Sequence, residues 1–256
     1  MGWFVHVMPK TKAAALHFLA SLIVTILTAF LVFLIWFPPP YQELVGGKNL
    51  FLLVIAVDTI CGPLLTAVVY SPLKSRKELI QDLGFIVLIQ LTALTYGVHT
   101  IAQSRPVYLV FEVDRFRVIT VADIQKEKLR PQQGGLHELP WLGPIVIGIR
   151  DAKDNKELME SLDLSLNGVA PSSRPEWWEP LSLSASKIIS AAHPIKELLE
   201  KHKDKETLIY EAIKASGLPK ESLSWLPVTS FKTNEWIALI NNQTAEVMSF
   251  APIDGF

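Results

Sequence analysis

Residues 16–37 read LHFLASLIVTILTAFLVFLIWF and contain no Asp, Glu, Lys or Arg. A helix needs about 20 mostly apolar residues to cross the hydrocarbon core of a bilayer, and this run is long enough. Two comparable runs follow: residues 50–70 contain one acid, Asp58, and residues 83–101 carry no full charge. We therefore predict three transmembrane helices within residues 1–104, followed by a more polar portion.

The whole chain is more apolar than an average soluble domain. Of its 256 residues, 50% are hydrophobic and 19% are charged, whereas charged residues make up about a quarter of a typical soluble domain. The formal net charge of −1 provides no basic field that would attract nucleic acid. The single cysteine, Cys61, excludes an internal disulfide and a zinc site with several cysteines.

Basic residues are unevenly distributed around the three runs. Those that precede the first run or follow the second are Lys10, Lys12, Lys74, Arg76 and Lys77; those on the other side are Lys48 and Arg105. Cytoplasmic loops carry the excess of Lys and Arg. We expect a cytoplasmic N-terminus, a cytoplasmic loop 71–82 and a periplasmic domain 105–256, in the inner membrane of a Gram-negative cell. The first run is longer than a signal-peptide core, so we expect an uncleaved anchor.

Asp58 is the most informative residue of the predicted spans. An ionisable group at this depth is costly unless it is paired or protonated. Depths counted at 1.5 Å per residue bring Thr28 and Tyr96 to a similar level, with His99 nearer the outer surface and Gln90 slightly on the inner side. One interpretation is a polar cluster of Asp58, Thr28, Tyr96 and His99 that holds the helices together. The others are proton or ion transport, and pairing with a polar group on a partner's transmembrane helix.

The residues that follow Asp58 predict an irregular helix. Pro63 removes the hydrogen bond to the carbonyl of Thr59 and is expected to kink the helix. Gly62 permits close approach of another helix. Cys61 is expected to be a small buried apolar residue.

The portion from residue 105 is predicted to be a mixed α+β domain. The expected strands are 107–113, 116–121, 145–149, 223–228, 236–240 and 245–250. The expected helices are 154–166, 184–201 with a kink or boundary at Pro194, and 204–216. Asp154 and Asp204 are predicted N-caps, Gly217 is predicted to end its helix, and Pro227 is expected to confine its strand to a sheet edge.

The domain contains no recognisable catalytic, nucleotide-binding or metal-binding motif. His137 and Glu138 are adjacent, but a metal site requires more convergent ligands, so we expect no metal and no cofactor. The pair Trp177–Trp178 lies in the turn-rich segment 171–180. It is either packed in the core or at the membrane interface, or it is a binding anchor, because tryptophan concentrates at interfaces.

Several motifs together resemble a known family. Residues 57–70 read VDTICGPLLTAVVY, residues 110–116 read VFEVDRF and residues 177–180 read WWEP. With the final hairpin, where Ala245 replaces a common Gly, these motifs resemble the TfpX/TfpZ family of type IV pilin accessory proteins, which has FimB-like relatives. The resemblance implies an inner-membrane accessory factor that binds or chaperones its cognate major pilin and promotes pilus assembly. It implies no enzymatic activity.

The candidate partner-binding residues are Asp58, Gly62, Pro63, Tyr96, Trp177 and Trp178. The expected partners are the major pilin, other pilus assembly proteins and membrane lipid, without nucleic acid or a small-molecule substrate. Two other classes remain open. One is a pilin-modifying enzyme resembling a glycosyltransferase, although such enzymes have more spans and no carboxylate pair is visible here. The other is a regulator of pilus dynamics that acts through the short loop 71–82.

Overall fold

The computed structural model describes residues 3–129 and 139–256. The chain divides into two compact units. The first, here called the helical unit, runs to Ser104 and leaves out Glu43–Val45. The second, here called the mixed unit, contains Glu43–Val45 and Arg105–Phe256.

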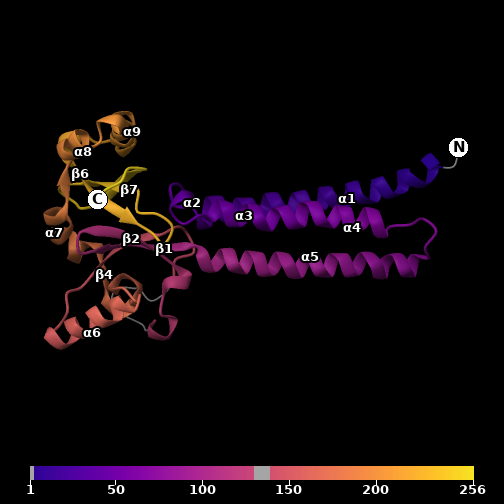
Figure 1. Cartoon of the computed structure of the whole chain (residues 1–256), viewed down its shortest axis with the longest axis horizontal. Coiled ribbons are helices and arrows are strands. Elements are labelled where there is room, and N and C mark those ends of the chain that lie inside the picture. Colours follow the sequence, from indigo (N-terminus) through magenta and orange to yellow (C-terminus); the bar gives the residue numbers. More distant parts are fainter. Residues whose placement is uncertain (1–2, 130–138) are drawn as a thin grey trace. The chain divides into compact units, whose positions relative to one another are not determined.

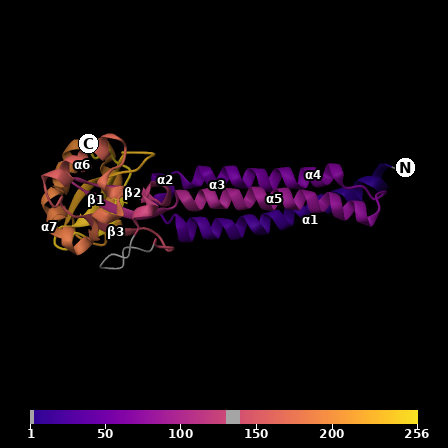
Figure 2. The same ribbon diagram turned by 90° about the horizontal axis from the view of Figure 1, so that it is seen from below.

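The helical unit consists of three long helical rods that run alongside one another (Figures 1 and 2). Its elements are α1 (Trp3–Phe30), η1 (Leu31–Trp36), α3 (Gly47–Ala56), η2 (Val57–Cys61), α4 (Gly62–Val69) and α5 (Arg76–Ser104), with α2 (Tyr41–Leu44) in the first connection. Among the described residues, three helices are long and apolar enough to cross a membrane: Lys10–Trp36, Gly47–Val69 and Arg76–Ser104. They correspond to the three predicted runs: the third helix contains residues 83–101, and the first two end one residue before Phe37 and Tyr70.

Close approaches hold the rods together. A Cβ added to Gly97 of α5 would lie 2.8 Å from both methyl carbons of Val54 in α3, so only glycine fits there without displacing the valine. Thr25 of α1 and Thr59 of η2 form a hydrogen bond of 3.2 Å between their hydroxyls. Small and hydroxylated residues therefore make contacts between these helices.

Two segments depart from regular α-helix. Both η1 and η2 are π-helical turns, in which the carbonyl of residue i faces the amide of residue i+5. η2 lies directly before Gly62–Pro63, where the sequence predicts a kink. Proline lacks an N–H, and a π-helical turn is one way in which a helix adjusts to that missing donor.

One mixed sheet forms the centre of the mixed unit. The strands are β1 (Pro106–Glu112), β2 (Arg115–Thr120), β3 (Ile145–Ile149), β4 (Trp178–Pro180), β5 (His193–Pro194), β6 (Leu223–Thr229), β7 (Trp236–Asn241) and β8 (Val247–Ala251). Their order is β4-β3-β1-β2-β6-β7-β8, with β5 also paired to β6. The β1–β3 and β2–β6 pairs are parallel and the other pairs are antiparallel.

Helices and short turns surround the sheet. The helices are α6 (Asn155–Leu166), α7 (Leu181–Ala191), α8 (Ile195–Lys201) and α9 (Glu206–Ser216). The 3-10 turns are η3 (Val121–Asp123), η4 (Lys126–Lys128), η5 (Pro171–Ser173), η6 (Pro175–Trp177), η7 (Lys203–Lys205) and η8 (Lys220–Ser222). One core cluster packs α8 and α9 against β6, β7 and β8, and another gathers around β1 and β3. The mixed α+β prediction is confirmed.

Three of the four helix boundaries predicted from the sequence are found in the structure, and one is wrong. Asp154 accepts a hydrogen bond from the backbone N–H of Glu157 and caps α6, as predicted. The helical stretch 184–201 is split at Pro194 into α7 and α8. Gly217 ends α9 with a left-handed backbone, as predicted. The predicted cap at Asp204 is wrong: the 3-10 turn η7 intervenes, so α9 begins at Glu206 without a side-chain cap.

The expectation of an edge strand at Pro227 is also wrong. β6 lies inside the sheet, between β2 and β7. On one side of β6, β5 pairs with Ser224 and Trp225, whereas β2 pairs with Val228 and Thr229. Pro227 occupies the interval between these two short pairings. A residue without an N–H is tolerated there because neither short partner requires a ladder bond from it.

Candidate functional site

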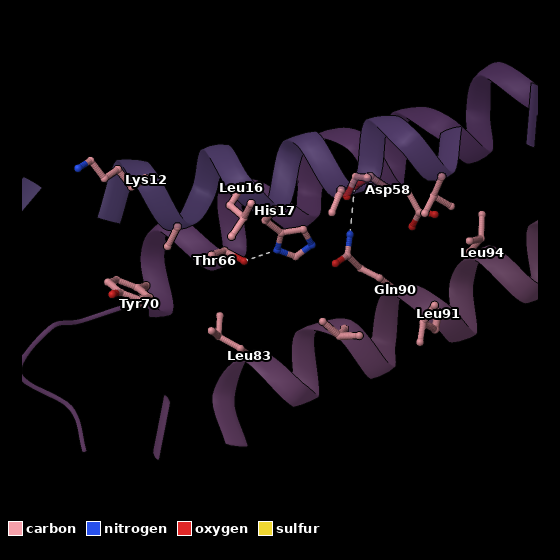
Figure 3. A pocket seen from close by; sticks show the side chains of 15 residues that line it. Lys12, Leu16, His17, Asp58, Thr66, Tyr70, Leu83, Gln90, Leu91 and Leu94 are labelled. Carbon is pink, nitrogen blue, oxygen red and sulfur yellow. Dashed lines mark hydrogen bonds between the residues drawn. The ribbon is translucent and has the colours of Figure 1, made fainter. Parts of the chain in front are cut away.

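The three rods of the helical unit surround a groove of about 730 Å³ (Figure 3). Its walls come from α1, from the η2–α4 segment and from α5, and they are mostly Leu, Val and Ala. The polar residues that line it include Lys12, His17, Ser21, Asp58, Thr66 and Gln90. Concave, mostly apolar sites with a few placed polar groups are typical of binding sites.

Gln90 of α5 connects two parts of the groove wall. In the π-helical register the carbonyl of Asp58 faces residue 63, which is proline and has no N–H to donate. The side-chain amide of Gln90 donates to this carbonyl oxygen instead, with 3.1 Å between Nε2 and O (Figure 3). The bond from α5 therefore replaces a backbone donor that the second rod cannot supply.

Gly62 makes room for that amide. A Cβ added to Gly62 would lie 2.0 Å from Nε2 of Gln90, far inside any allowed contact. The Gly-Pro pair thus has two linked effects: Pro63 removes a donor, and Gly62 leaves the space through which Gln90 provides another. This explains physically why these residue types follow Asp58.

The carboxylate of Asp58 lies in the groove wall with one unpaired oxygen. The residue is 8% exposed, and its Oδ1 is buried without a hydrogen-bond partner among the described residues. A buried polar atom without a partner costs free energy, and such atoms are rare in folded proteins. A hydrogen-bond donor or a cation in the groove would find an acceptor here.

A second polar contact joins α1 to α4 along the same groove. Nδ1 of His17 and the hydroxyl of Thr66 are 2.5 Å apart, and Thr66 is buried (Figure 3). Neither His17 nor Thr66 is among the candidate residues named from the sequence. Their polar character inside apolar runs was a visible signal, but the pairing was not.

The predicted polar cluster of Asp58 with Thr28, Tyr96 and His99 is wrong. Thr28 donates to the carbonyl of Val24 in its own helix, and Tyr96 and His99 are exposed. Depth alone does not set direction, because successive residues of an α-helix are rotated by about 100°. Relative to Gln90, Tyr96 is therefore turned by about 120° and His99 by about 180°. Cys61 is exposed as well, contrary to expectation.

Trp177 and Trp178 are buried in the mixed unit. Trp178 packs against Tyr108 with ring centroids 4.6 Å apart, and its Nε1 donates to the carbonyl of Ser172 at 2.9 Å. Burial raises the pKa of Tyr108 to about 12. These contacts favour core packing over a binding anchor for Trp178.

Trp177 is held by two guanidinium groups. Those of Arg150 and Arg174 lie 4.8 Å and 4.7 Å from its ring centroid. Arg174 is itself buried, and this burial lowers the pKa of its side chain. Arg150 also forms a bidentate pair with Glu157, and its hydrogen bond is the largest cause that lowers the pKa of Glu157 to about 2. Trp177 is thus packed within a charged network rather than presented as a surface anchor.

Within residues 3–129 and 139–256, no group of three or more His, Cys, Asp or Glu side chains is arranged to hold a metal ion. His137 and Glu138 lie outside the described residues.

The known proteins that this chain resembles all have the same description. The family model described as "Fimbrial assembly protein FimB" matches residues 5–46. The chain is 33% identical to the fimbrial assembly protein of serogroup I from Dichelobacter nodosus over 246 residues, which cover 96% of this chain and 95% of the relative. The serogroup E1 protein of the same organism is 32% identical over the same coverage. The protein of serogroups C1 and C2 is 44% identical over 118 residues, or 46% of this chain and 90% of the relative.

These matches define a fimbrial assembly protein. With full-length similarity above 30% identity, the chain belongs to the FimB family of fimbrial assembly proteins. The relatives support a role in type IV pilus assembly. No solved structure matches the chain.

Proposed function

We propose that this protein is an inner-membrane accessory factor that binds or chaperones its cognate major pilin and promotes assembly of the pilus. The full-length similarity to fimbrial assembly proteins supports the process, and the three apolar helices support the location. The excess of Lys and Arg supports an orientation in which the N-terminus and the loop between α4 and α5 are cytoplasmic and the mixed unit is periplasmic.

The groove of the helical unit carries the binding part of the proposal. On α1 its lining extends from Lys12 to Val24, which is about 18 Å of helix, or a little more than three turns. A pilin in the membrane presents one hydrophobic helix. A helix that lies along an apolar groove contacts it with residues spaced about one turn apart. A donor on that helix would meet the unpaired oxygen of Asp58.

Site-specific photocrosslinking tests this proposal. Leu91 lines the groove and Ile89 does not, yet both are on α5 and are exposed to similar degrees, 55% and 60%. They are separated by only about 3 Å in depth but by about 200° around the helix. A photoreactive residue at Leu91 should capture the major pilin, whereas one at Ile89 should not. Equal capture from both positions, or none from either while pili are made, would contradict binding in the groove.

The charge of Asp58 provides a second test. Asp58→Asn keeps the size of the side chain and removes the charge. We expect the variant to insert at normal abundance with reduced piliation, because an amide does not attract a positive group as a carboxylate does. Thr92→Val is the control, since Thr92 is exposed, donates to a carbonyl of its own helix and does not line the groove. Wild-type piliation in Asp58→Asn would leave Asp58 as a structural residue only.

Two simpler measurements test the remaining parts. A reporter that works only in the periplasm should be active when fused after Phe256, and activity of a cytoplasmic reporter there would reverse the topology. The mass of the pilin should be the same with and without this protein. A mass difference would instead support the alternative of a pilin-modifying enzyme.

A further inference from the structure

We propose that Trp141 and Leu142 form a second membrane contact, in which a loop of the mixed unit inserts into the outer lipid interface. The inference depends on membrane insertion of α5 and is independent of pilin binding. It assigns a lipid surface as the ligand of a segment that the proposed function leaves without a role.

The two side chains are adjacent, large and exposed. Trp141 is 66% exposed and Leu142 is 78% exposed, in the irregular segment that precedes β3. Gly143 follows with a left-handed backbone, φ 56°, and so turns the chain directly after them. Single exposed apolar residues are ordinary, but a neighbouring Trp and Leu at a turn form a compact apolar tip.

Arg105 fixes this tip. Its Nη2 donates to the carbonyl of Pro140 at 3.4 Å, and its guanidinium carbon lies 4.7 Å from the ring centroid of Trp141. Arg105 is buried, and its carbonyl accepts a hydrogen bond from Val121, so the residue is held on both its side chain and its backbone. The position of Trp141 is therefore tied to that of Arg105.

Chain continuity sets the depth of Arg105. This residue directly follows Ser104, the last residue of α5. The apolar run ends at Ile101, so Arg105 lies about 6 Å beyond the hydrocarbon boundary if the helix runs along the membrane normal. The headgroup layer is about 5–8 Å thick on each side, since the hydrocarbon core spans about 30 Å of a bilayer of 40–45 Å. Because the ring of Trp141 stacks on the side chain of Arg105, the proposal assigns the ring to that layer or directly beside it.

The chemistry of the tip fits that layer. Tryptophan is enriched at membrane–water interfaces, where its ring is partly in apolar and partly in polar surroundings. Leucine beside it adds apolar surface for the acyl-chain boundary. Leu166, the last residue of α6, is also large, apolar and exposed but lies outside this tip, so it provides a matched comparison.

Fluorescence quenching in lipid nanodiscs, with the full chain and no pilin, tests the contact. Cys61→Ala removes the native thiol, and an environment-sensitive dye is attached to Leu142→Cys, Leu166→Cys or Ile89→Cys in turn. The dye at Leu142 should emit at shorter wavelength and be quenched by lipids brominated near the headgroup. The dye at Leu166, which is 89% exposed, should instead be quenched by iodide in the buffer. Ile89 on α5 reports insertion of the helix itself.

The outcomes distinguish membrane insertion of α5 from the lipid contact of Trp141 and Leu142. If the dye at Ile89 is quenched by lipid and the dye at Leu142 behaves like the one at Leu166, the lipid contact is overturned while membrane insertion stands. If the dye at Ile89 escapes lipid quenching, insertion of α5 fails and the lipid contact fails with it. Trp141→Ala should reduce the lipid quenching at Leu142, because the ring that Arg105 holds is gone. Unchanged quenching in that variant would overturn the role of Trp141.

Discussion

Gly62→Ala is the sharpest test of the groove wall, because its effect should depend on one residue of another helix. The new Cβ would lie 2.0 Å from Nε2, 2.6 Å from Cδ and 2.8 Å from Oε1 of Gln90. The amide must move by more than 1 Å to reach ordinary contact. Its bond of 3.1 Å to the carbonyl of Asp58 is then lost.

The change in stability that Gly62→Ala causes is the sum of two opposing effects. An interhelical hydrogen bond in a membrane contributes about 0.6–1.7 kcal/mol, and loss of this one leaves a carbonyl without a donor. Alanine favours helix over glycine by up to about 1 kcal/mol. We therefore expect Gly62→Ala to destabilise the protein by about 1 kcal/mol or less, and Gln90→Ala to do so by a similar or larger amount.

The informative quantity is the coupling between the two substitutions. In a Gln90→Ala background no amide blocks the new methyl group, so Gly62→Ala should be neutral or stabilising. The coupling energy should be about 1–2 kcal/mol, measured by a double-mutant cycle of reversible unfolding in mixed micelles. Gly97→Ala is the control: its Cβ would meet Val54 at 2.8 Å, so its cost should be the same in both backgrounds. Equal costs of Gly62→Ala in both backgrounds would refute the account of the Gly-Pro pair.

Three further predictions concern the mixed unit. Val113 is exposed and has φ 62°, a left-handed backbone conformation that is strained for valine. Val113→Gly should therefore raise the free energy of unfolding by about 1 kcal/mol. An unchanged thermal midpoint of unfolding would show that this backbone strain does not affect stability. Trp178→Ala should destabilise by about 3–5 kcal/mol, as a buried aromatic does, and a stable variant that loses pilin capture would restore the anchor interpretation. Hydrogen bonding to Arg150 lowers the pKa of Glu157 from 4.5 to about 2. The stabilisation by the ionised Glu157 carboxylate is therefore fully present above pH 4.5 and is lost as the pH falls through about 2. The difference in unfolding free energy between wild type and Glu157→Gln should shrink over that pH range. A difference that stays constant with pH would argue against the ion pair between Glu157 and Arg150.

The sequence predicted the local elements of the mixed unit well and their assembly poorly. Local signals are carried by a few neighbouring residues: Asp154 caps α6 and Gly217 ends α9, as their types indicate. The parallel β1–β3 and β2–β6 pairs join strands that are distant in the sequence. No local signal specifies such pairings. The wrong edge prediction at Pro227 has the same cause. A proline shows that its own N–H is missing from the sheet, but it does not show how the neighbouring strands are arranged around it.

In the helical unit the lengths of the runs predicted the rods, but the faces of the helices were not predictable from regular spacing. A π-helical turn accommodates one extra residue, so every side chain after η2 is rotated away from the position that α-helical spacing assigns to it. Thr66, five residues after the end of η2, is one of these side chains, and it contacts His17. A usable signal was nevertheless present. A Gly-Pro pair inside an apolar helix frees a carbonyl four or five residues before the proline, and that carbonyl requires a donor within the membrane. Gln90 has a side-chain amide donor and lies near the depth of Asp58, so a search for a donor to the freed carbonyl identifies Gln90. A search for polar residues at the depth of Asp58 identified Tyr96 instead.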